Sequence, residues 1–161
     1  MGSTPEKMIL VPVDFTVYSR AALIFGCQMA ELMNAKLVVL HVIHDPGDAP
    51  GFYAKRRNQK SLRKMEDVAL EKMQHFLLKT MKKFPEHKNL KSAETMLVSG
   101  LPVTRIIEIA TKQQPQMVVM GNQGRTALSH LLLGSKATQV VKLCPVPITI
   151  VKHHEPQGED D

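Results

Sequence analysis

The sequence predicts a single α/β domain built on a parallel sheet that is doubly wound, with helices on both of its faces. Five short apolar runs of strand length alternate with four longer segments of helical periodicity over residues 7–152. Parallel neighbours need crossover connections, and right-handed crossovers place helices on both sides of the sheet. A chain of 161 residues supplies one sizeable core. We expect flexible ends at 1–6 and 153–161.

The first half of the pattern is two strands with a helix between them. Residues 7–15 and 35–43 are aliphatic runs rich in Val, Leu and Ile, as expected of strands that are covered on both faces. Between them, residues 19–33 carry apolar side chains at helical spacing. Ser19 is available as the amino-terminal cap of this helix.

A long helix, a strand and a shorter helix follow. Residues 61–84 keep apolar side chains three or four apart, with Lys and Glu on the opposite face. Residues 93–99 form the third predicted strand. Gly100 and Pro102 then mark the turn into a helix over 103–113.

The last part of the chain predicts a strand, a helix and a final strand. Residues 116–121 are the fourth apolar run, and residues 135–143 are helical until two prolines in "CPVP" end the helix. The fifth strand is expected over residues 148–152, from Ile148 to Lys152.

Composition indicates a soluble protein that favours anionic partners. The net charge is +6, and no apolar run approaches the roughly 20 residues of a membrane-spanning helix. The aromatic content of 4% argues against a stacking platform for nucleic acid. No export signal is visible, and Cys27 and Cys144 lie in apolar helical patterns. We therefore expect buried thiols and a cytoplasmic location.

The glycines after the fourth strand predict an anion site. Gly121 directly follows the strand, Gly124 closes a four-residue unit, and Gly134 and Ser135 open a helix nine residues later. Glycines can adopt left-handed angles and turn several N–H groups into one concavity. A helix N-terminus also favours negative charge. Two ordinary turns and a helix cap are the alternative.

This spacing is neither a Walker A loop nor the G-x-G-x-x-G fingerprint. It resembles the nucleotide-binding branch of the universal stress protein family, whose signature is G, two residues, G, nine residues, G, then S or T. The resemblance extends to "ILVPVDFTVYSRAAL", "VVLHVI", "VVMGNQG" and "CPVPITIVK", in order over residues 7–152. It implies a Rossmann-like fold of the adenine nucleotide α-hydrolase type, with strand order 3-2-1-4-5.

The resemblance also implies a nucleotide pocket. Base and ribose would meet residues at the ends of the first, second and fourth strands, and the phosphates would meet the glycines and the helix that follows. The residues of this pocket are Pro12, Val13, Asp14, Val42, Met120, Gly121, Gly124, Arg125, Gly134, Ser135 and Lys136.

Several of these residues have a second interpretation. Asp14 suits ribose hydroxyls or the adenine amino group, but it is also a candidate helix cap. Val42 and Met120 suit a core equally well. Arg125 and Lys136 suit ordinary exposed positions.

The expected function is a regulatory module that binds ATP, or AMP or ADP, with or without Mg²⁺, and hydrolyses it slowly at most. A weak ATPase or adenylyl-transfer enzyme is the alternative, and a nucleotide-free interaction protein is a third hypothesis. No catalytic residue is predicted. We expect no metal site at "HVIHD", because His41 and His44 fall on opposite faces of a strand. The resemblance implies a homodimer through Ile148 to Lys152.

Overall fold

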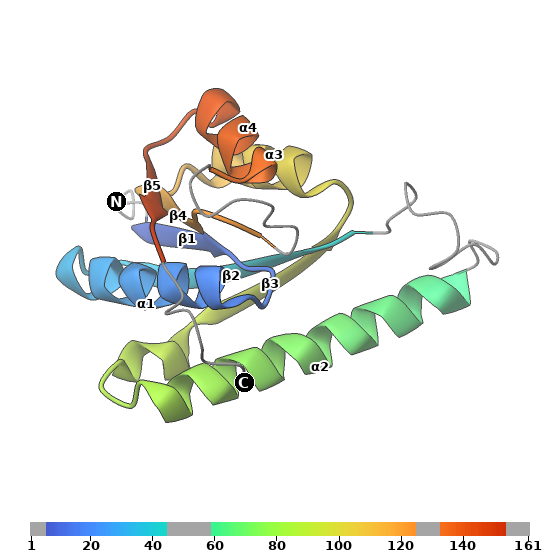
Figure 1. Ribbon diagram of the computed structural model, residues 1–161, viewed down its shortest axis with the longest axis horizontal. Helices are drawn as coiled ribbons and strands as arrows, with labels where there is room; N and C mark the ends of the chain where they lie inside the picture. Colours follow the sequence, from blue (N-terminus) through green and yellow to red (C-terminus); the bar gives the residue numbers. More distant parts are fainter. Residues whose placement is uncertain (1–5, 45–58, 125–132, 154–161) are drawn as a thin grey trace, which may run out of the picture.

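One parallel sheet forms the centre of the molecule. The structure is a computed structural model that describes residues 6–44, 59–124 and 133–153. Its five strands lie in the order β3-β2-β1-β4-β5, which confirms the predicted order (Figure 1). The strands are β1 (Met8–Pro12), β2 (Lys36–Ile43), β3 (Glu94–Ser99), β4 (Met117–Gly121) and β5 (Ile148–Val151).

In the described residues, four α-helices connect these strands, close to the predicted ranges. They are α1 (Val17–Leu32), α2 (Gln59–Lys83), α3 (Pro102–Gln113) and α4 (Ser135–Leu143). A short 3₁₀ helix, η1 (Lys88–Ser92), was not predicted. No helix in the described residues is long and apolar enough to cross a membrane.

The helices form a layer on each face of the sheet. Helices α1 and α2 cover one face, and α3 and α4 cover the other (Figure 1). Along β1, Ile9 and Val11 belong to the core beneath α1 and α2, whereas Met8 and Leu10 belong to the core beneath α3 and α4. Both faces of the strand are buried, which explains why its sequence shows no polar alternation.

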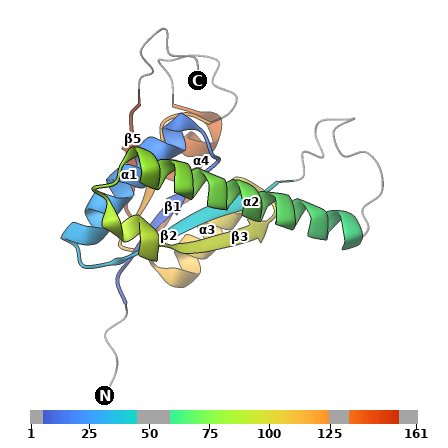
Figure 2. The same cartoon turned by 90° about the horizontal axis from the view of Figure 1, so that it is seen from below.

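The order of the strands creates a switch point between β1 and β4. From β1 the chain passes through α1 to β2 on one side, whereas from β4 it passes through α4 to β5 on the other. Connections that leave in opposite directions open a crevice beyond the carboxyl ends of the two strands, where open α/β sheets bind ligands. The amino-terminal turns of α2 extend past the same edge of the sheet (Figures 1 and 2).

Helix α1 begins earlier than predicted, and Ser19 is not its cap. Thr16 is the N-cap, and its hydroxyl accepts a hydrogen bond from the Ser19 amide at 3.3 Å. The Ser19 hydroxyl donates to the Thr16 carbonyl at 3.1 Å. The reason is the backbone at Phe15, whose φ of 69° reverses the chain sharply enough for the helix to start at Val17.

Substitution of Gly26 on α1 by Ala tests how closely this helix approaches the sheet. A Cβ at Gly26 would lie 2.5 Å from Cγ2 of Val11. We expect Gly26→Ala to lower the free energy of unfolding by about 1 to 3 kcal/mol through overpacking, despite its gain in helix propensity. Urea denaturation measures the change. The exposed Gln28→Ala on the same helix is the control, with an expected change within about 0.5 kcal/mol. A Gly26→Ala protein of wild-type stability would contradict the tight approach.

The two cysteines differ in accessibility, and this difference makes a second prediction. Cys27 is fully buried, as predicted, whereas Cys144 at the end of α4 is only half-buried. Burial raises the pKa of the Cys27 thiol to about 12. The folded state thus favours the neutral thiol, so this contribution to stability is complete below about pH 9 and is lost as the pH rises toward 12.

A thiol reagent at pH 8 should therefore modify Cys144 in the native protein and reach Cys27 only in denaturant. Mass spectrometry of the labelled peptides distinguishes the two sites. Equal labelling of both cysteines under native conditions would show that the prediction is wrong.

Candidate functional site

The carboxyl ends of β1 and β4 bring Asp14 and Gly124 together. A Cβ built on Gly124 would lie 3.1 Å from Oδ2 of Asp14, so a larger residue would crowd the carboxylate. The two residues are far apart in the chain and meet because their strands are neighbours in the sheet.

Gly121 and Gly124 serve close approach and not left-handed geometry. Gly100, with a φ of 139°, is the glycine with positive φ among the described residues. The prediction that Gly121 and Gly124 use left-handed angles is therefore wrong. At Gly121 the reason for glycine is the first turn of α1, because a Cβ there would lie 2.7 Å from the carbonyl oxygen of Tyr18.

The third glycine joins the loop after β4 to the start of α4. The amide of Gly134 donates to the carbonyl of Asn122 at 2.9 Å, and Gly134 is the N-cap residue of α4. The first amides of a helix have no intrahelical acceptors, and the helix dipole places positive potential there. Ser135 and Lys136 open this helix and are both exposed. Arg125 lies outside the described residues.

The two carboxylate oxygens of Asp14 face different parts of the site, one the turn before α1 and the other the loop after β4. Oδ1 accepts hydrogen bonds from the Thr16 hydroxyl at 2.6 Å and from the Thr16 amide at 3.2 Å. Oδ2 is the atom nearest to the position of a Cβ on Gly124. Asp14 therefore supports the residue that caps α1, and one oxygen is still directed toward the loop after β4.

Aromatic side chains hold the turn that follows Asp14. The ring of Phe15 stacks on His41 with 4.2 Å between ring centroids, and it lies 5.6 Å from the ring of Phe76. His41 Nδ1 lies 2.8 Å from the carbonyl oxygen of Val13. These aromatic contacts were not predicted from the sequence, because no local signal marks a phenylalanine that adopts positive φ.

The remaining residues of the predicted pocket lie at strand ends and are mostly buried. Val42 and Met120 are 8% and 9% exposed and belong to the core beneath α3 and α4. The Val13 amide donates to Leu40 O at 2.7 Å, and Pro12 is half-buried. Among the described residues, no group of three His, Cys, Asp or Glu side chains could hold a metal ion.

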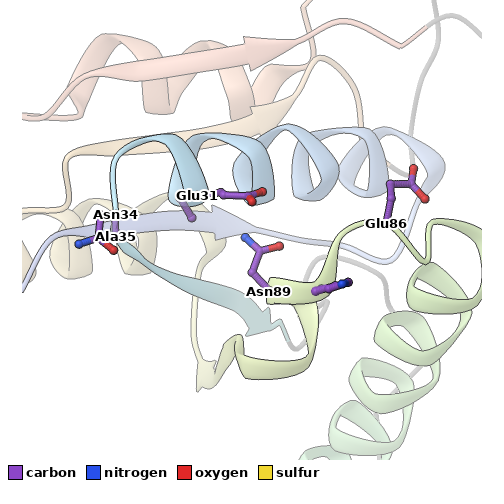
Figure 3. A pocket seen from close by; sticks show the side chains of 7 residues that line it. Glu31, Asn34, Ala35, Glu86 and Asn89 are labelled. Atoms are coloured by element: carbon purple, nitrogen blue, oxygen red, sulfur yellow. The ribbon is translucent and has the colours of Figure 1, made fainter.

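A separate hollow of about 570 Å³ lies between the end of α1 and η1 (Figure 3). Asn89 donates from Nδ2 to the carbonyl of Cys27 at 2.8 Å beside it. Its lining contains none of the predicted pocket residues and consists of Ala30, Glu31, Asn34, Ala35, Glu86, Lys88 and Asn89. We therefore place the candidate site at the β1 and β4 ends.

Known proteins of one family have sequences similar to this chain. A family model described as the Universal stress protein family matches residues 6–152. Universal stress protein MJ0531 of Methanocaldococcus jannaschii is 30% identical over 151 residues, which cover 94% of this chain and 85% of that protein.

Solved structures agree with the sequence comparison. MJ0577 of the same organism superposes with a TM-score of 0.69 at 22% identity, over 95% of this chain and 100% of that one. A family protein from Arabidopsis thaliana, solved with AMP bound, gives a TM-score of 0.58 at 16% identity, over 94% of this chain and 97% of that one. At these identities the two structures support the shared fold. Because the family model spans nearly all of the described residues, the chain belongs to the universal stress protein family.

Proposed function

We propose that this protein binds an adenine nucleotide, ATP in preference, in the crevice beyond the carboxyl ends of β1 and β4. The observation that carries the proposal is the convergence of Asp14, Gly124 and Gly134, which come from three separate parts of the chain. Backbone amides beside glycine and at a helix start suit phosphate, and a carboxylate suits ribose hydroxyls. The AMP bound to the Arabidopsis relative is consistent with this chemistry.

Each part of the nucleotide has a proposed set of contacts. The base and ribose lie among Pro12, Val13 and Asp14. The apolar surface of the pocket comes from Val42 and Met120. The phosphates meet the amides of residues Gly121–Gly124, here called the glycine loop, and the amides of the first turn of α4. The residues proposed for the phosphates are Gly121, Gly124, Arg125, Gly134, Ser135 and Lys136.

In this proposal the protein is a regulatory module with slow hydrolysis at most. Bound nucleotide would connect the loop after β4, the start of α4 and the turn after β1, and so stabilise all three. Ligand that binds only the folded state raises stability in proportion to the logarithm of its concentration. The free cysteines, Cys27 and Cys144, fit a reducing compartment such as the cytoplasm.

The nucleotide proposal predicts a thermal shift that depends on Asp14. ATP at 100 times its Kd should add about 2.7 kcal/mol, which corresponds to a rise in Tm of roughly 5 to 10 °C. Asp14→Asn keeps an oxygen for Thr16 but loses the charge, so we expect an affinity about tenfold weaker. Calorimetric titration with ATP, ADP and AMP, with and without Mg²⁺, measures the affinities.

Asp67→Asn is the matched control, because it removes the same charge from an exposed position on α2. It should bind like the wild type. If ATP leaves the Tm of the wild type unchanged, the proposed function is wrong. If Asp14→Asn and Asp67→Asn bind equally well, the assignment of Asp14 is wrong.

We also propose a homodimer through β5. This strand is one edge of the sheet, so its outer backbone groups have no partner strand among the described residues. An equivalent strand of a second copy would satisfy them.

Light scattering coupled to size exclusion tests the dimer. We expect twice the chain mass for the wild type and a shift toward monomer for Thr149→Lys on β5, because lysine on an edge strand opposes pairing. Thr95→Lys on the opposite edge strand, β3, is the control and should remain dimeric. A monomeric wild type would contradict the proposal.

A further inference from the structure

Asn122 is a buried residue that forms hydrogen bonds with three parts of the chain. It is 8% exposed and directly follows β4. Its amide donates to the carbonyl of Val151 at 3.1 Å, and its carbonyl accepts from the amide of Gly134 at 2.9 Å. Its side-chain Oδ1 accepts from the amide of His153 at 3.1 Å. The same residue thus contacts the end of β5, the start of α4 and the segment that leaves the sheet.

His153 is held against the body of the protein, although the sequence predicted that it begins a flexible tail. Besides its amide bond to Asn122, its ring meets the ring of Tyr18 edge-on with 6.0 Å between centroids. Tyr18 lies in the first turn of α1, and its carbonyl oxygen is the atom that requires glycine at position 121. The end of β5 therefore packs on the same turn of α1 as the glycine loop.

We propose that Asn122 is a positioning residue that couples nucleotide binding at the glycine loop to the carboxyl end of β5. This inference rests on the proposed nucleotide function and names a residue that the motif leaves unspecified. The two backbone bonds of Asn122 fix the loop to β5 and to α4, and they form with any residue other than proline at this position. The side-chain bond is specific to this residue, because it requires an acceptor that reaches the amide of His153.

The physical reason for the coupling is that Asn122 is part of the glycine loop and also binds the amide of His153 beyond β5. A phosphate that orders Gly121–Gly124 restrains the backbone of Asn122, which in turn holds Oδ1 in place for the amide of His153. Conversely, the bond to His153 limits the motion of Asn122 before ligand arrives, so less conformational entropy is lost on binding. Each site should therefore stabilise the other.

The first test is hydrogen exchange at the amide of His153, measured by NMR with and without ATP. In the wild type, ATP should slow this exchange. Asn122→Ala removes the acceptor, so the amide should exchange roughly fivefold to tenfold faster in the free protein, and ATP should no longer protect it. Equal protection by ATP in the wild type and in Asn122→Ala would overturn the coupling.

The second test is a double-mutant cycle on ATP affinity. Asn122→Ala removes the acceptor and His153→Pro removes the donor, and each should weaken binding by roughly threefold to thirtyfold. The double variant should bind like either single variant, because both substitutions break the same bond. Effects that multiply would overturn the proposal.

Two controls separate this role from a general loss of stability. His153→Ala loses the ring but keeps the amide, so it should bind ATP within about twofold of the wild type. Asn89→Ala removes the amide that donates to Cys27 O at the opposite end of the sheet, so it should lower stability without changing affinity. If His153→Ala weakens binding as much as His153→Pro, the ring contact with Tyr18 carries the effect and the proposal is wrong.

Failure of this proposal is distinguishable from failure of the proposed function. A wild type that binds no adenine nucleotide contradicts both. A wild type that binds ATP with an affinity unchanged in Asn122→Ala contradicts the role of Asn122 alone.

Discussion

The close approach of α1 to the sheet is the constraint on which the candidate site depends. A Cβ on Gly26 would lie 2.5 Å from Cγ2 of Val11, and a Cβ on Gly121 would lie 2.7 Å from the carbonyl oxygen of Tyr18, so α1 packs this close to the sheet because both positions are glycine. Since a parallel sheet is buried beneath its helices, this spacing sets the position of the turn between β1 and α1. Asp14, in that turn, consequently lies beside Gly124 at the end of the neighbouring strand.

The turn itself is stable because several modest interactions offset one unfavourable backbone conformation. Left-handed angles at Phe15 cost about 1 to 2 kcal/mol. The stack of Phe15 on His41 stabilises the turn by about 0.5 to 1.5 kcal/mol, and each hydrogen bond from Thr16 to Asp14 stabilises it by about 1 kcal/mol. The balance favours the observed turn. The same interactions hold the carboxylate in place before any ligand binds, which lowers the entropy cost of binding.

Local patterns in the sequence were sufficient for the fold and the family. Uninterrupted aliphatic runs identified the strands because the sheet is covered on both faces, and three- or four-residue spacing identified the helices. The gapped glycine motif, together with the matching strand ends, identified the universal stress protein family and its strand order. The residues that would contact nucleotide stay a prediction. The cap at Ser19 was wrong, because the start of α1 depends on the backbone of Phe15, which sequence periodicity does not record.

The sequence by itself thus determined which segments are strands and helices, because burial of a whole segment leaves a periodic signature. Only the tertiary structure decided why the motif contains glycine. At Gly121 and Gly124 the reason is close approach to Tyr18 and Asp14, residues that the chain brings near from a distance of about a hundred positions. It also decided that Asn122 links β5, α4 and His153, since these bonds join segments on separate strands and helices. Contacts of this kind depend on the packing of α1 on a folded sheet, and no local stretch of sequence specifies them.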